Sequence, residues 1–144
     1  MKLNEGRLQT GEHILARIIQ NRIPDAKVVI ARFDKDTEGC LDMTSVSDLR
    51  LVANLEAAVN AVIKANLRVV TTELPRDQAS KEFDISKIPE SAIKIRVIEI
   101  EGFDRRTCRD PHTMNTSDVG VFRMIKIEKA GKDRYRFIFT VTDK

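Results

Sequence analysis

The chain of 144 residues lacks the features that mark membrane and secreted proteins. Its purely apolar runs, such as residues 28–31, are a few residues long, whereas a helix that crosses a bilayer needs roughly 18. The first residues turn polar at once and contain no apolar stretch like that of a secretory signal. We therefore expect a cytoplasmic protein that has no membrane partner.

Cysteine and glycine are scarce. Cys40 and Cys108 are the two cysteines, and a reducing cytoplasm disfavours a disulfide, so each is expected to be a free thiol. The six glycines are scattered, which excludes a glycine-rich phosphate loop, and no Gly-x-Ser-x-Gly turn occurs. These absences argue against a phosphate-loop enzyme and against an α/β-type serine hydrolase.

The composition that remains is typical of one globular domain, expected over residues 1–144. Charged residues make up 33% and hydrophobic residues 42%, which disfavours a disordered chain. The net charge of +3 is unevenly placed, because residues 94–136 contain 11 basic and 7 acidic residues. The basic C-terminal part favours an anionic partner.

Hydrophobic periodicity predicts an α+β domain, in which a mainly antiparallel sheet packs against a long helix and an N-terminal helix. The N-terminal helix is expected from Thr10, acting as its cap, to Arg22, and the long helix over residues 47–65. The remaining expected elements are strands at 27–33, 40–43, 67–72 and 93–100, a short helix at 77–83, an irregular loop at 104–118, and a hairpin of 122–128 with 135–141.

Both histidines stand at spacings that suit a shared site. His112 follows Cys108 by four positions, and thiolate and imidazole are ligands that zinc prefers. His13 lies one helical turn after Gln9, so both side chains can point the same way. The residues alone leave other interpretations open: a partly buried thiol beside a surface histidine, or a nucleophilic Cys108 with a histidine as base.

Three arginines, Arg105, Arg106 and Arg109, crowd the segment that contains Cys108 and His112. Such a cluster suits contact with the phosphate backbone of a nucleic acid. A solvated loop without a partner is the open alternative.

Several motifs, in their order along the chain, resemble the editing domain shared by alanyl- and threonyl-tRNA synthetases, which is called the second additional domain. The resemblance is greatest to short free-standing AlaX-type trans-editing proteins. Residues 10–15 resemble the family's His-Thr-x-x-His-x-Leu helix, and residues 108–112 its Cys-x-x-x-His motif. Further likeness lies in the segment after the long helix, the Arg-Val-Val strand and the Thr-Gly-Glu-Ile-Gly turn, at residues 66–76, 95–98 and 115–120.

The resemblance implies that the first helix and the Cys-x-x-x-His loop meet across a cleft floored by an antiparallel sheet. It implies a trans-acting hydrolase that deacylates mischarged tRNA, with tRNA(Ala) carrying Ser or Gly as substrate and the tRNA acceptor end as partner. The implied catalytic residues are Gln9, His13, Cys108 and His112, of which the last three would hold zinc. The implied substrate-binding residues are Thr116, Arg105, Arg106 and Arg109.

Two departures from the family pattern affect these expectations. Gln9 replaces the first motif histidine, and a neutral amide is a poorer zinc ligand, so the site has three strong ligands, or binds no metal. The alternative function is therefore a tRNA-binding module that has lost metal and catalysis; a scaffold without an RNA role is a third class. Residues 26–33 contain no Thr or Ser where AlaX proteins read a substrate hydroxyl, which argues against serine.

Overall fold

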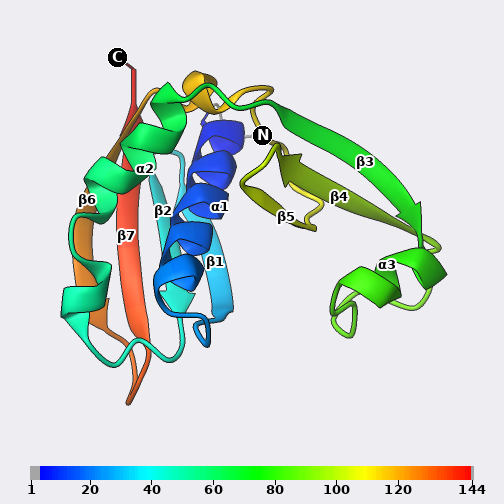
Figure 1. Ribbon diagram of the computed structural model, residues 1–144, viewed down its shortest axis with the longest axis horizontal. Coiled ribbons are helices and arrows are strands. Elements are labelled where there is room, and N and C mark those ends of the chain that lie inside the picture. The colour runs from blue at the N-terminus through cyan, green and yellow to red at the C-terminus, as the bar shows by residue number, and fades with distance from the viewer. Residues whose placement is uncertain (1–3, 144) are drawn as a thin grey trace.

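The body of the protein is a four-stranded antiparallel sheet with two helices on one face (Figure 1). The computed structural model describes residues 4–143. The strand order is β1-β2-β7-β6, which joins the first hairpin to the last one. The elements of the body are α1 (Glu5–Arg22), β1 (Val28–Lys35), β2 (Glu38–Met43), α2 (Leu55–Lys64), β6 (Val121–Lys129) and β7 (Tyr135–Thr142).

The core lies between α1, α2 and the inner face of this sheet. The apolar side chains of α1 recur at helical spacing, and the inner residues of β7 alternate with outer ones, so the two sets meet in one layer. Phe122 and Phe139 stack there with ring centroids 5.1 Å apart. The fully buried core side chains include Leu8, Ile14, Leu15, Ile19, Leu41, Phe122, Phe137 and Phe139.

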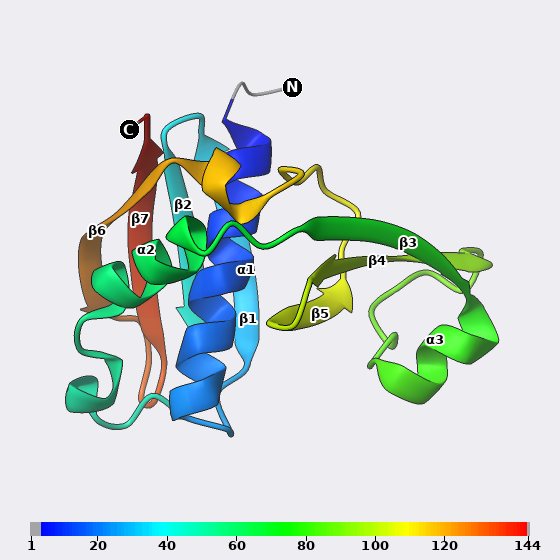
Figure 2. The same ribbon diagram turned by 45° about the horizontal axis from the view of Figure 1, so that its top comes forward.

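A second antiparallel sheet, of order β3-β4-β5, extends away from the body as an arm with α3 near its outer end (Figures 1 and 2). Four apolar residues of β4 are buried: Ile95, Val97, Ile98 and Ile100. The elements of the arm are β3 (Val69–Pro75), α3 (Arg76–Glu82), β4 (Lys94–Ile100) and β5 (Asp104–Thr107). The expected α+β class with mainly antiparallel strands is confirmed.

The expected start of the first helix is wrong. Helix α1 begins at Glu5, and Thr10 is a fully buried residue inside it rather than its cap. The extra turn forms because Leu8 extends the apolar stripe of the helix into the core. The hydroxyl of Thr10, which could have capped a helix, instead accepts a hydrogen bond from the Thr113 amide, 3.0 Å away.

The long helix expected over residues 47–65 is also wrong. A short 3-10 helix, η1 (Leu49–Val52), comes first, and α2 starts only after Asn54. Asn54 has a left-handed backbone with φ of 57°, which interrupts the helical hydrogen-bond ladder. Asparagine is among the few residues that adopt this conformation readily, and this is why the helix is divided here.

The loop expected over residues 104–118 is partly ordered. Its start forms β5, which pairs with β4, and its end forms the 3-10 helix η2 (Thr116–Val119). Gly120 closes η2 with φ of 89°, and a Cβ there would lie 2.2 Å from the carbonyl oxygen of Thr142. Only glycine fits this position, so the loop returns to β6 at a fixed point.

Within the described residues, no helix is long and apolar enough to cross a membrane.

Candidate active site and metal-binding cluster

Three side chains that could hold a metal ion converge from two distant parts of the chain. Helix α1 supplies His13, and the segment after β5 supplies Cys108 and His112. One potential ligand atom from each residue lies within 4.8 Å of the other two. The rings of His13 and His112 are 4.3 Å apart between centroids, and Nε2 of His112 lies 3.4 Å from Sγ of Cys108. An imidazole, thiol and imidazole at this spacing form a donor set suited to zinc.

The ring of His13 is the strongest sign that this cluster fits a metal ion. It is fully buried, yet neither ring nitrogen has a hydrogen-bond partner among the described residues. Burial lowers the pKa of His13 well below its usual value, and the nearby charge of Arg106 lowers it further, so the ring is neutral and keeps a lone pair. Buried polar atoms rarely stay unpaired without a reason, and coordination of a cation would satisfy one of them.

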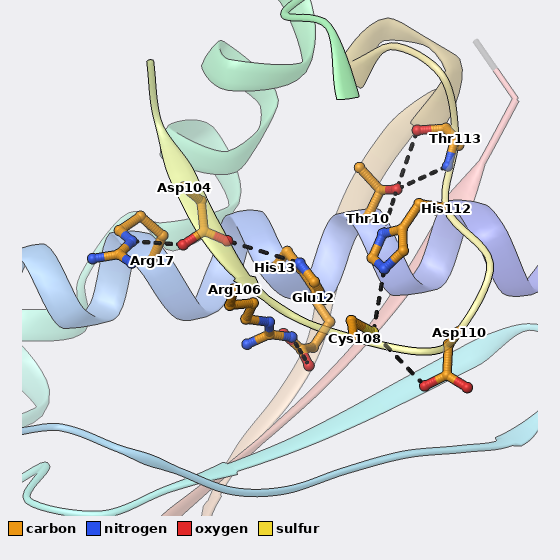
Figure 3. Close-up of polar contacts among 10 residues, drawn as sticks. All are labelled: Thr10, Glu12, His13, Arg17, Asp104, Arg106, Cys108, Asp110, His112 and Thr113. Atoms are coloured by element: carbon orange, nitrogen blue, oxygen red, sulfur yellow. Dashed lines mark hydrogen bonds and ion pairs between the residues drawn. The ribbon is translucent and has the colours of Figure 1, made fainter. Parts of the chain in front are cut away.

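Asp104 faces the far side of His13. Its Oδ2 lies 3.8 Å from Nδ1 of His13, and its Oδ1 accepts a hydrogen bond of 2.7 Å from Nε of Arg17 (Figure 3). A carboxylate behind an imidazole is the arrangement that orients metal-binding histidines in other proteins. Asp104 therefore favours a His13 ring that carries its proton on Nδ1 and turns Nε2 away from the carboxylate.

Thr10 plays the corresponding part for His112. Its Oγ1 lies 3.2 Å from Nδ1 of His112, and the Thr113 hydroxyl has its own acceptor, the carbonyl oxygen of Asn115 at 2.9 Å. The Thr113 hydroxyl also lies 3.1 Å from Oγ1 of Thr10. When Nδ1 of His112 carries the proton, the Thr10 oxygen accepts from it and the Nε2 lone pair faces Cys108. Burial, with Arg106 and Arg96, lowers the pKa of His112 to about 3, so this ring is neutral too.

Sequence reasoning singled out neither Asp104 nor Thr10 as a site residue. For Asp104 a signal was present: Asp104, Arg106 and Cys108 stand two residues apart, and in a strand such residues share one face. The irregular loop expected over residues 104–118 has no such period, so that expectation hides the signal. Thr10 lies in the segment that resembles the family's helix motif, but its spacing relates it to no other site residue, because its partners lie more than 100 residues away in sequence.

Arg106 is engaged within the protein. It forms an ion pair with Glu12, with Nη2 2.5 Å from each carboxylate oxygen, and the Glu12 side chain is only 2% exposed. Burial raises the pKa of Glu12, and the Arg106 guanidinium opposes that rise. The charge of Arg106 thus compensates a buried carboxylate, which joins β5 to α1 directly beside His13.

The other two arginines of this segment, Arg105 and Arg109, differ in whether an ion pair uses their charge. Arg105 pairs with Glu82 at 2.5 Å and with Glu99 at 2.9 Å, so its charge is also used inside the arm. Arg109 is exposed and lies at the rim of the site next to Cys108. Of the three arginines expected to bind substrate, Arg109 is the one whose side chain forms no ion pair within residues 4–143.

Thr116 is not brought to this cluster. It is fully buried, its hydroxyl donates to the carbonyl oxygen of Val62 at 3.0 Å, and it accepts from the amide of Leu67 at 2.9 Å. These bonds fasten η2 to the C-terminal end of α2. Thr116 therefore has a structural role: it holds the loop in place, away from the two histidines.

Gln9 and Cys108 border one cavity of about 660 Å³, a size usual for small-molecule sites. Gln9 is buried on α1, one turn before His13, as its spacing predicted. One wall comes from β1 and is apolar, formed by Val28, Ala31 and Phe33. The carboxylates on the lining are Glu12, Asp84, Asp104 and Asp110.

Comparison with known proteins relates the sequence of this chain to tRNA-editing domains. Residues 95–138 match the family model described as threonyl and alanyl tRNA synthetase second additional domain. The chain is 28% identical to the alanyl-tRNA editing protein AlaX-M of Saccharolobus solfataricus, with 94% of this chain and 58% of that protein aligned. It is 26% identical to AlaX-L of Pyrococcus horikoshii, over 92% of this chain and 33% of that protein.

A third relative is the alanine–tRNA ligase of Pyrobaculum arsenaticum, 27% identical over 93% of this chain but only 16% of the ligase. The chain therefore spans between about a sixth and three fifths of the length of these relatives. The likeness nevertheless covers more than nine tenths of this chain in each of the three relatives. The resemblance expected from the motifs is confirmed, and relates this chain to the alanyl- and threonyl-tRNA synthetase second additional domain and to the AlaX editing proteins.

Proposed function

We propose that this chain is an aminoacyl-tRNA hydrolase that removes a wrong amino acid from tRNA(Ala) in trans. The observation that carries the proposal is the cluster of His13, Cys108 and His112 beside the cavity that Gln9 borders. The likeness to AlaX editing proteins supports the reaction class. The partner would be the acceptor end of the tRNA, where the ester bond lies.

In this proposal the three clustered side chains would hold zinc, which when bound would supply a Lewis acid for hydrolysis of the ester. The amide of Gln9 donates a hydrogen bond to the carbonyl oxygen as negative charge develops there. The carboxylates of Asp104 and Asp110 favour the positive α-ammonium of the substrate, because opposite charges attract strongly in a partly enclosed cavity. The ion pair of Glu12 with Arg106 fixes β5 against α1 and so keeps Cys108 in place.

The amino acid to be removed would contact the wall formed by β1. Val28, Ala31 and Phe33 offer no hydroxyl or amide to read a substrate hydroxyl, whereas Thr107 lies elsewhere on the lining. An apolar wall forms no hydrogen bond with the hydroxyl of serine, so that hydroxyl does not make a seryl group bind more tightly than a glycyl group. Of the two expected substrates, glycyl-tRNA(Ala) is therefore favoured over seryl-tRNA(Ala).

A panel of tRNA(Ala) charged with glycine, serine or alanine tests the proposal. Protein purified without chelator should release glycine fastest, and a matched sample treated with chelator should lose this activity and regain it on addition of zinc. A protein that binds these tRNAs but hydrolyses none of them with zinc present would instead support the alternative of a tRNA-binding module. That alternative is suggested by Gln9, which stands in place of the motif histidine.

Gln9→His is expected to tighten zinc binding. The substitution supplies a fourth strong ligand one turn before His13, and each added ligand of this kind contributes on the order of 3 kcal/mol, about a hundredfold in affinity. Competition with a chromophoric chelator measures the change. The matched control is Gln20→His, which places a histidine on the same helix at the far part of the cavity lining. Equal zinc affinity in the parent and Gln9→His would show that Gln9 does not face the ion.

Thr10→Val should weaken zinc binding by about 10- to 100-fold. Valine has nearly the same shape, but it removes the oxygen that holds Nδ1 of His112 and so frees the ring to turn. The same competition measurement applies, and Thr10→Ser, which keeps the oxygen, should retain most of the affinity. If valine and serine variants bind zinc equally well, the hydrogen bond to His112 does not orient the ligand.

A further inference from the structure

A second cavity lies on the other side of Cys108, within the arm. It has a volume of about 320 Å³ and is formed by β4, by the segment 87–92 that leads into it, and by the end of β5. Thr107, Cys108 and Arg109 line both this cavity and the larger one. The two cavities therefore share a wall that contains a residue of the proposed metal site.

The charges on the two linings differ. The larger cavity has four carboxylates and three arginines, and two of those carboxylates, Glu12 and Asp104, are already paired with arginine. The charged residues around the smaller cavity are all cations: Lys87, Lys94, Arg96 and Arg109. Within the part of the chain that the structure describes, none of these four forms an ion pair with a carboxylate. Asp84 is close enough for the charge of Lys87 to contribute to the lowering of its pKa, but it forms no ion pair with it. Like charges held together without ion-paired carboxylates repel one another, so an anion that entered here would relieve that repulsion.

The cations are held on a fixed frame. Nη1 of Arg96 donates to the carbonyl oxygen of Arg109 at 2.9 Å, and the Cys108 amide donates to the carbonyl oxygen of Arg96 at 3.2 Å. These bonds tie the Cys108 segment to β4 and so fix the shared wall. Between the cations the lining is apolar, with Ile88, Pro89, Ala92 and Ile95, which suits the face of a base or a ribose.

We propose that this smaller cavity binds the single-stranded 3′ end of the tRNA, with backbone phosphates on Lys87, Lys94, Arg96 and Arg109. The inference rests on the proposed function, and it extends it by assigning the two cavities to the two parts of one substrate. The terminal ester lies in the larger, acidic cavity, where an α-ammonium is favoured. The preceding phosphates lie in the smaller, basic one, across the wall formed by residues 107–109. Phosphate binding thus belongs to this cavity rather than to Arg105 and Arg106, whose charges are used inside the protein.

The test compares binding of an uncharged RNA minihelix that ends in a single-stranded CCA overhang with binding of the same minihelix cut blunt. The variant is Lys87→Ala with Lys94→Ala; both side chains are exposed, so folding is not at risk. The control is Lys129→Ala with Lys132→Ala, which removes the same charge from the β6–β7 hairpin. Uncharged RNA makes the readout independent of hydrolysis and of metal.

We expect the Lys87/Lys94 variant to bind the overhang minihelix about tenfold more weakly than the parent. The slope of log affinity against log salt should also become shallower by about 1.4, because two phosphate contacts to a single strand are lost. The control and the blunt minihelix should show little change. Lys94→Arg, which keeps the charge, should retain the affinity. Equal losses in variant and control, or in overhang and blunt RNA, would overturn the proposal.

Two further outcomes separate this inference from the proposed function. If adenosine monophosphate alone binds as tightly as the overhang minihelix, the cavity is a mononucleotide site and the inference is wrong. If the parent binds the overhang through Lys87 and Lys94 but deacylates no tRNA, the inference stands and the hydrolase proposal fails. If deacylation occurs while the variant keeps full affinity, only the inference fails.

Discussion

Cys108→Ser is expected to reduce zinc affinity by two to three orders of magnitude and to abolish hydrolysis with it. Serine keeps the shape of cysteine but its hydroxyl does not ionise near neutral pH, so one of three ligands is lost at a cost of about 3 to 4 kcal/mol. Burial raises the pKa of the Cys108 thiol, so without a cation this side chain stays protonated beside Nε2 of His112. Chelator competition measures the loss in affinity directly.

The chain provides a matched control for this change. Cys40 is the other free cysteine and lies on β2, where its sulfur is 3.9 Å from Oδ1 of Asp42, outside the metal-binding cluster. Cys40→Ser makes the same chemical substitution and should leave zinc content as in the parent. A Cys108→Ser protein that retains zinc as tightly as the Cys40→Ser protein would remove Cys108 from the ligand set.

Arg106→Met is expected to lower the free energy of unfolding by about 3 kcal/mol, since it leaves the Glu12 carboxylate buried without its partner. In a chain of this length such a loss lowers the melting temperature by about 10 °C. Thermal and urea unfolding measure it. A decline in RNA binding by Arg106 variants would then reflect a damaged fold.

The double variant Glu12→Leu with Arg106→Met distinguishes this effect from a general loss of packing. Replacing both members of a buried ion pair by apolar residues removes the unpaired charge, and stability should return to within about 1 kcal/mol of the parent. Arg105→Met serves as the control, because its partners Glu82 and Glu99 are partly accessible to water and its pairs contribute little. Equal destabilisation by the single and double variants would show that the charge of Glu12 is not the cause.

The parts of the candidate site that were predictable from the sequence are the residue pairs that lie a few positions apart in the chain. The four-residue intervals of Gln9 with His13 and of Cys108 with His112 place each pair together, because a helix turn and a short loop have fixed dimensions. The hairpin of β6 with β7 was predictable for the same reason, since alternation with period two identifies which face is buried. The family resemblance then placed the two pairs opposite one another.

The tertiary structure alone decided which charged and polar groups are available for function. Glu12 and Arg106 are 94 residues apart, and Thr10 and Thr113 are 103 apart, so no local period relates them. Arg105, Arg106 and Arg109 look alike in the sequence, yet two of them are neutralised by carboxylates and one is not. Burial and ion pairing depend on which segments meet in space, and this is set by the packing of the whole chain. The sequence by itself thus determined the class of fold and the types of the candidate ligand residues, while the fold determined how those side chains are oriented and where the cations remain unpaired.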